Sequence, residues 1–452
     1  MSTIHAATAL TPEGWRSDVR LTIEGDAIAA VETGAPPAPN DDRCAIAIPA
    51  IANLHSHAFQ RGMAGLAEYR GQGRDTFWTW RETMYRFALT MSPEDVEAVA
   101  AQLYVEMLEA GFAAVAEFHY LHRAPDGTSY AAPAELAGRI LAAATEAGIG
   151  LTLLPVFYAH ATFGGAPPLP EQRRFLSDIG SFARLLEDSR ALMRRFPRAI
   201  VGVAPHSLRA AAPAELTELV ALAGDAPIHI HAAEQVGEVE DCLRWSGARP
   251  VEWLLDRQPI DKRWCLIHAT HMTSDETRRL AQSGAVAGLC PVTEANLGDG
   301  VFNAPEFIAE GGRYGIGSDS NILIGVGAEL RQLEYAQRLR DRSRNICAIG
   351  GGSTGRALYE AALAGGAQAL GRATGRLAPG GVADIVSLRA EHPTLVGRAG
   401  DAILDAWIFS GGGGALESVW SAGRKVVVDG RHPRREAIAA RFGATLRALL
   451  AR

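Results

Sequence analysis

The sequence predicts an α/β fold, a (β/α)₈ TIM-like barrel joined to a small β-sandwich domain that both chain ends form. Eight short apolar segments alternate with amphipathic ones between residues 51 and 321, which is typical of parallel strands with helices outside them. Eight repeats favour a closed barrel over an open, doubly wound sheet. The chain has 452 residues, of which 48% are hydrophobic, so it can bury a core of this size.

Each apolar segment is expected to be one barrel strand. The eight expected strands are residues 51–58, 112–118, 150–158, 199–207, 227–234, 264–271, 285–294 and 313–321. Helices are expected between them, because several of the intervening segments open with helix-start signals. Ser92 precedes Pro93 and two acidic residues, and Thr273 with Glu276 forms a capping box.

The flanks of the barrel contain short β-type runs separated by turn signals such as Asp429-Gly430. We therefore expect residues 1–48 and 376–430 to form the small β-domain and residues 49–375 to form the barrel. Residues 431–452 are expected to be a C-terminal helix.

Charge and composition exclude several classes of function. The net charge of −7 gives no electrostatic case for binding nucleic acid or an anionic membrane. No apolar run approaches the roughly 18 residues that span a bilayer, and the first residues lack a secretory signal. The five cysteines are odd in number, dispersed and without a C-x-x-C pair, as in a reducing compartment. We expect a cytoplasmic protein with neither nucleic-acid nor membrane partners.

Histidines and carboxylates stand at the ends of the expected strands, where barrel enzymes place their active sites. His55 and His57 close the first strand, and the two-residue period directs both imidazoles to the same side. The further candidates, at the ends of strands five, six and eight, are His229, His231, Glu234, His268 and Asp319. A barrel brings these ends around one axis, so three histidines and a carboxylate predict a site for zinc or iron(II).

The same residues resemble the amidohydrolase superfamily over nearly the whole chain. The likeness rests on Pro49, Asn53-Leu54-His55-Ser56-His57, His231-x-x-Glu234, His268, Ser318-Asp319 and Gly380-Gly381-Val382-Ala383-Asp384. The chain is most similar to the single-metal deaminase branch. This resemblance implies one divalent metal ion, Zn²⁺ with Fe²⁺ as the alternative. The implied ligands are His55, His57, His231 and Asp319.

The two-metal branches of the superfamily bridge their ions with a carbamylated lysine or a carboxylate near strand four. Residues 199–207 contain neither, and the chain has only two lysines among its 44 basic residues. Of these two, Lys262 lies in a polar turn before strand six. A single ion is therefore expected.

Two runs, His55-Ser-His-Ala-Phe-Gln60-Arg61-Gly62 and His231-Ala-Ala-Glu-Gln235, are similar to the formimidoylglutamate deiminases within this superfamily. This resemblance implies hydrolysis of N-formimino-L-glutamate to N-formyl-L-glutamate and ammonia, a step of histidine degradation. Water activated by the metal would attack the formimino carbon, because a metal lowers the pKa of bound water to about 7.

Three residues are expected to move protons in this reaction. Asp319 can accept the proton of the water beside the metal, and Glu234 is placed to deliver protons to the departing nitrogen. His268 can orient the water or help to deprotonate it. The choice between His268 and Asp319 as the main general base stays open.

The implied substrate is a small dicarboxylate, so the site needs planar, forked cationic donors. Arg209 follows strand four, and Arg81 lies in what we expect to be a long loop after strand one. Both are expected to bind substrate carboxylates. The resemblance also indicates Gln60, Tyr120 and His206 as polar contacts.

Two other functions are compatible with a barrel of this kind, a ring deaminase and a non-catalytic scaffold. A deaminase of the same superfamily could act on a purine or pterin ring, but a flat neutral ring does not call for two arginines. A barrel that had lost catalysis could serve as an assembly scaffold, against which the complete ligand set argues. A homodimer is expected from base rates and the family resemblance.

Overall fold

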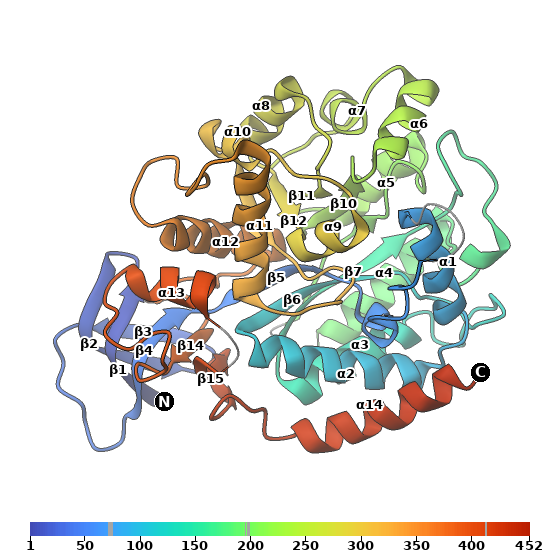
Figure 1. Ribbon diagram of the computed structural model, residues 1–452. Helices are drawn as coiled ribbons and strands as arrows, with labels where there is room; N and C mark the ends of the chain where they lie inside the picture. Colours follow the sequence, from blue (N-terminus) through green and yellow to red (C-terminus); the bar gives the residue numbers. More distant parts are fainter. Residues whose placement is uncertain (71–75, 195, 197–198, 412–413) are drawn as a thin grey trace.

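The computed structural model describes residues 1–70, 76–194, 196, 199–411 and 414–452. A barrel of parallel strands surrounded by helices occupies most of the molecule, and a smaller sheet lies beside it (Figure 1). The predicted fold class is confirmed.

The barrel strands run parallel and close on themselves. They are β5 (Ile51–Ser56), β6 (Phe112–His119), β7 (Gly150–Phe157), β8 (Ile200–Val201) with β9 (Ala204–Pro205), β10 (Ile228–Ala232), β11 (Trp264–His268), β12 (Val286–Leu289) and β13 (Arg313–Ile316). Isolated bridges from Val203 to Ile228 and from Ser56 to Asp319 connect the two halves. The first strand therefore lies beside the last, and the strand ends share one face.

Several strands end earlier than predicted. β12 stops at Leu289 instead of residue 294, because Pro291 opens a helix directly after it. β11 stops at His268 (φ 69°), and Asp319 (φ 44°) lies beyond the end of β13. Left-handed backbone breaks the extended conformation at these positions.

Helices cover the outside of the barrel. They are α2 (Pro93–Glu109), α3 (Glu135–Ala147), α4 (Ile179–Met193), α5 (Pro213–Ala223), α6 (Val236–Ser246), α7 (Pro250–Arg257), α8 (Ser274–Ser283), α9 (Pro291–Leu297), α10 (Ala304–Ala309), α11 (Val326–Asp341) and α12 (Thr354–Leu370). The two capping predictions are confirmed: Ser92 Oγ accepts a hydrogen bond from the amide of Asp95, and Thr273 Oγ1 from that of Glu276. Short 3₁₀ segments η1 (Ala58–Met63) and η2 (Pro170–Gln172) lie in loops.

One expected loop is a helix. α1 (Phe77–Ala88) follows β5 and carries Arg81, which we had expected in an irregular loop. At its start the amide of Thr76 donates to Thr79 Oγ1 at 3.0 Å, and that hydroxyl donates to the carbonyl of Thr76 at 2.7 Å. Arg81 is therefore presented from a regular element.

The small domain is one seven-stranded sheet made from both ends of the chain. Its strands are β1 (Ser2–Thr11), β2 (Gly14–Glu24), β3 (Ala27–Glu32), β4 (Asp42–Pro49), β14 (Ile385–Leu388), β15 (Leu416–Ser421) and β16 (Arg424–Val427), in the order β16-β15-β14-β4-β1-β2-β3. Pairing of β4 with β14 joins the N-terminal strands to the C-terminal ones. Residues from both ends, such as Leu21 and Ile385, share one apolar core. We retain the division at residues 48, 375 and 430 as a proposal.

Two helices complete the chain. α13 (Ala402–Ser410) precedes β15, and α14 (Arg435–Leu450) packs along α2 at the edge of the barrel (Figure 1). Arg435 pairs with Glu109 of α2, and Arg441 pairs with Glu146 of α3. None of the helices in the described ranges is long and apolar enough to cross a membrane.

Candidate active site

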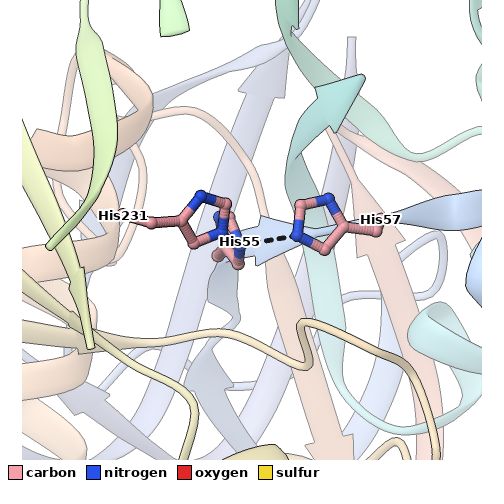
Figure 2. A group of neighbouring side chains, drawn as sticks. All are labelled: His55, His57 and His231. Atoms are coloured by element: carbon pink, nitrogen blue, oxygen red, sulfur yellow. Dashed lines mark hydrogen bonds between the residues drawn. The ribbon is translucent and has the colours of Figure 1, made fainter. Parts of the chain in front are cut away.

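Three histidine side chains from two strand ends converge on one point (Figure 2). The Nε2 atom of His55 lies 3.1 Å from Nε2 of His57 and 3.1 Å from Nε2 of His231. Asp319 completes the group, with Oδ1 at 3.3 Å from His57 Nε2 and 3.5 Å from His55 Nε2. The four side chains predicted as metal ligands are therefore brought together.

Hydrogen bonds on the far side of two of these rings show that the group suits a cation. His57 Nδ1 lies 3.0 Å from the carbonyl of Phe118, and His231 Nδ1 lies 2.9 Å from the carbonyl of His206. A carbonyl can only accept, so each Nδ1 carries the proton and each Nε2 directs a lone pair inward. Lone pairs that meet beside a buried carboxylate repel one another unless a cation lies between them. The donor set of three nitrogens and one oxygen fits a divalent metal.

The backbone fixes Asp319 directly against the two histidines of strand one. The amide of His57 donates to the carbonyl of Asp319 at 3.0 Å, and the amide of Asp319 donates to the carbonyl of His55, also at 3.0 Å. The Asn321 side chain donates to the carbonyls of Asp319 (2.9 Å) and His57 (3.1 Å). Asp319 is thus held in its left-handed conformation by bonds on both sides.

A buried polar chain behind this segment was not predicted from the sequence. Asn53 Nδ2 donates to Ser318 Oγ at 2.6 Å, and Ser318 Oγ donates to Asn321 Oδ1 at 2.6 Å. All three side chains are buried. The polar run from residue 318 to residue 321, directly after an apolar strand, is the signal that could have indicated it.

The protonation states agree with metal ligation. Burial lowers the pKa of His55 to about 3, so this ring is neutral. Burial alone would raise the pKa of Asp319, but the close imidazole nitrogens of His55 and His57 hold it well below its usual range. Neutral imidazoles and an ionised carboxylate are the forms that bind metals.

Glu234 and His268 lie beside this group, as predicted. His268 Nε2 is 3.7 Å from Glu234 Oε1 and 3.9 Å from Asp319 Oδ2. Burial raises the pKa of Glu234. Burial alone would lower the pKa of His268, but the surrounding carboxylates, Glu234 foremost, raise it to about 10. Protons can therefore be held between these two groups at neutral pH.

Glu294 also contacts His268 and was missed by the sequence prediction. Its Oε1 lies 3.2 Å from His268 Nδ1 and accepts the amide of Cys290 at 2.8 Å. His268, Cys290 and Glu294 form a second cluster of potential metal donors. However, Glu294 Oε1 already has two partners, so hydrogen bonding explains the cluster. The signal was Pro291, which opens a helix within the segment that we assigned to strand seven.

A cavity of about 580 Å³, including its open mouth, lies over the metal-ligand group. It is lined by all five residues predicted to contact substrate, Gln60, Arg81, Tyr120, His206 and Arg209, together with Glu234, His268 and Asp319. Further lining residues that the prediction did not name are Met84, Tyr85, Tyr158, Phe175 and Leu297. Metal donors, proton-transfer groups and cationic donors therefore share one space.

Several polar atoms in this cavity wall have no partner among the residues that the structure describes. Gln60 donates through Nε2 to the Tyr120 hydroxyl at 2.8 Å, which leaves its buried Oε1 unpaired. Arg209 Nε is likewise buried and unpaired, and its Nη2 lies 3.9 Å from Glu234 Oε2. Such groups need a ligand or water to satisfy them.

Fold and site define a metal-dependent hydrolase of the barrel type, and comparison with known proteins agrees. Residues 46–426 match the Amidohydrolase family, so the chain belongs to that family. Residues 1–45 match the N-terminal domain of the formimidoylglutamate deiminase HutF. The resemblance predicted from the motifs is confirmed.

Two relatives are similar over their full length. Formimidoylglutamate deiminase from Pseudomonas aeruginosa is 52% identical over 453 residues, covering 100% of both chains. The crystal structure of an amidohydrolase from Brucella melitensis is 57% identical, with a TM-score of 0.96 and complete coverage of both chains.

Other deaminases are more distant. The 8-oxoguanine deaminase of Pseudomonas aeruginosa is 28% identical and is matched over 77% of this chain and 75% of its own length. An adenosine deaminase from Xanthomonas campestris, solved with bound zinc, is 21% identical with a TM-score of 0.82, covering 100% of this chain and 98% of that one. This last likeness shows the fold alone.

Proposed function

We propose that the protein hydrolyses N-formimino-L-glutamate to N-formyl-L-glutamate and ammonia. The observation that carries this proposal is one cavity over the metal-ligand group that His57, His231 and Asp319 line together with two proton-transfer groups and two arginines. The full-length likeness to a formimidoylglutamate deiminase supports the same substrate. The reaction belongs to histidine degradation.

His55, His57, His231 and Asp319 would hold one divalent ion, Zn²⁺ with Fe²⁺ as the alternative. When bound, the ion supplies a Lewis acid that makes a water nucleophilic at neutral pH. The chain contributes the rigid donor set, because carbonyls fix the tautomers of His57 and His231.

Asp319 is placed to receive the proton of the attacking water, and His268, whose raised pKa keeps it protonated, is placed to orient that water. Asp319 is ionised, and its Oδ2 lies 3.9 Å from His268 Nε2, so both groups can face the same water. Attack on the formimino carbon forms a C–O bond and a tetrahedral centre. Glu234, whose pKa burial raises, delivers a proton to the departing nitrogen. As the C–N bond breaks, the nitrogen receives the second proton, which Asp319 holds, and leaves as ammonia; the hydroxyl proton of the tetrahedral centre returns to Glu234, and the formyl carbonyl remains.

The substrate's charges match the wall of the cavity. Arg81 and Arg209 provide cationic donors for carboxylates, and His206 and Tyr120 add neutral polar contacts. The unpaired Gln60 Oε1 can accept a hydrogen bond from a substrate N–H. A neutral purine would leave the buried Nε of Arg209 unsatisfied, which disfavours ring deamination here.

An ammonia-release assay tests this proposal. The purified protein is assayed with N-formimino-L-glutamate and, in parallel, with guanine and 8-oxoguanine, while bound metal is quantified by elemental analysis. We expect turnover of the linear substrate alone and about one zinc or iron per chain. Turnover of a purine without turnover of formiminoglutamate would refute the proposal, and a metal-free, inactive protein would favour a scaffold.

We also propose a homodimer, the commonest soluble oligomer. We propose that it lies in the cytoplasm, because its dispersed free cysteines suit a reducing compartment. Light scattering of the eluted protein at several concentrations checks the mass. A mass of one chain at all concentrations would contradict the dimer.

A further inference from the structure

Two tyrosines that no prediction included lie in the wall of the active-site cavity near the arginines. Tyr85 comes from α1, and Tyr158 directly follows β7. Both side chains line the cavity that Arg81 and Arg209 also line, and both are more than nine-tenths buried. Their hydroxyl groups therefore face either the protein or a ligand, with little access to bulk water.

Gln172 fixes the direction of hydrogen bonding at these hydroxyls. This residue ends η2 and is fully buried. The amide of Leu169 donates to Gln172 Oε1 at 2.8 Å, which identifies that atom as the oxygen. The opposite atom, Nε2, donates to the Tyr158 oxygen at 2.9 Å and to the Tyr85 oxygen at 3.4 Å. Both phenol oxygens are therefore acceptors toward the protein.

Each phenol still has one proton to donate. Among the residues that the structure describes, no carboxylate or carbonyl accepts either proton. Burial raises the pKa of Tyr158, so it keeps its proton at neutral pH. The phenol O–H groups are therefore left to donate into the cavity.

The neighbouring cations show which ligand these O–H groups suit. Arg209 Nε is buried without a partner. The Arg81 guanidinium lies 4.4 Å from the ring of Trp78 and 5.5 Å from that of Tyr85. Two guanidinium groups and two donor hydroxyls lining the same cavity favour an anion with several acceptor oxygens.

We propose that Tyr85 and Tyr158, oriented by Gln172, form the neutral part of a carboxylate subsite that Arg81 and Arg209 complete. This inference rests on the proposed function, because it assigns one of the two substrate carboxylates to these donors. The tyrosines determine specificity, and Gln172 is a positioning residue. A substrate without that carboxylate leaves the hydroxyl donors unpaired and is rejected.

The test compares three substrates in the metal-loaded enzyme: N-formimino-L-glutamate and its two mono-amides, each of which lacks one carboxylate charge. We expect Tyr85→Phe and Tyr158→Phe each to raise KM for the dicarboxylate by about ten-fold, with a small change in kcat. One mono-amide should show the same ten-fold rise, since it retains the bound carboxylate. The other should be insensitive to both substitutions.

Tyr359→Phe is the matched control, because that buried phenol donates to the carbonyl of Pro49 at 2.6 Å and does not line the cavity. It should lower Tm without changing any KM. Gln172→Leu should reproduce the substrate pattern of the tyrosine variants; if it fails to fold, the tyrosine variants alone decide. An unchanged KM in both tyrosine variants, or equal rises for all three substrates, overturns the subsite. Absence of wild-type turnover of formiminoglutamate instead refutes the proposed function.

Discussion

Substitution of Glu294 tests whether this carboxylate orients the His268 ring for proton transfer. Its Oε1 accepts from His268 Nδ1 at 3.2 Å and from the amide of Cys290 at 2.8 Å. A carboxylate at Nδ1 leaves Nε2 facing Glu234 and Asp319, which is the orientation that proton transfer needs. Glu294→Gln keeps an acceptor oxygen and removes only the charge, whereas Glu294→Ala removes both.

The expected magnitude follows from this single contact. A buried hydrogen bond to a charged group contributes roughly 1.5–3 kcal/mol. If that energy holds His268 in its reactive orientation, Glu294→Ala should lower kcat by about 10- to 150-fold. Glu294→Gln should lower it by about ten-fold or less. KM should stay nearly constant, because Glu294 does not line the substrate cavity.

Steady-state ammonia release with formiminoglutamate measures both constants. Glu329→Gln is the control, because Glu329 accepts the amide of Val292 at 2.9 Å and so supports the same helix α9 without contacting His268. Equal losses of kcat in the two glutamine variants would show that Glu294 only stabilises α9. A raised KM with unchanged kcat would also refute the orienting role.

Three further outcomes are expected. Asp319→Asn should abolish turnover and reduce bound metal, since one change removes a ligand charge and a proton acceptor; near-normal rates would contradict both roles. Arg209→Met should raise KM for formiminoglutamate by about 10- to 150-fold, because charge-assisted hydrogen bonds are lost. Arg209→Lys keeps the charge and should raise KM less. An unchanged KM in Arg209→Met would place the residue outside the binding site. Burial lowers the pKa of His122 to about 4, so the unfolded chain binds its proton first as pH falls below 6.5. The stability that neutral His122 contributes is present above pH 6.5 and is lost toward pH 4, by up to roughly 3 kcal/mol. In urea denaturation, the free energy of unfolding of His122→Gln should fall less between pH 7 and pH 5 than that of the wild type. Equal falls would show that His122 does not cause this pH dependence.

The strands of the barrel could be predicted because apolar runs and helix-start signals are local. Their ends could not, since left-handed backbone at His268 and Asp319 depends on contacts with neighbouring strands. The helix α1 was also missed. Its sequence is rich in aromatic residues and threonine, which are weak helix formers, and Tyr85 and Phe87 pack into the core.

The candidate site was predictable to the extent that its residues stand at strand ends. His55, His57, His231 and Asp319 follow apolar runs, so the barrel alone brings them together. Gln172 could not be found in this way, because its partners Tyr158 and Tyr85 lie 14 and 87 residues away, after strand β7 and in helix α1. Only the packing of these segments shows that the glutamine faces two phenols.

The sheet that joins both chain ends cannot be completed until late in synthesis. Strand β4 ends at Pro49, and its partner β14 begins at Ile385. At roughly 5–20 residues per second, a ribosome takes roughly 20 to 70 seconds to travel between them. During that interval β4 has an open edge, which is a site for pairing with other chains. We expect nascent chains of this protein to depend on chaperones until β14 emerges.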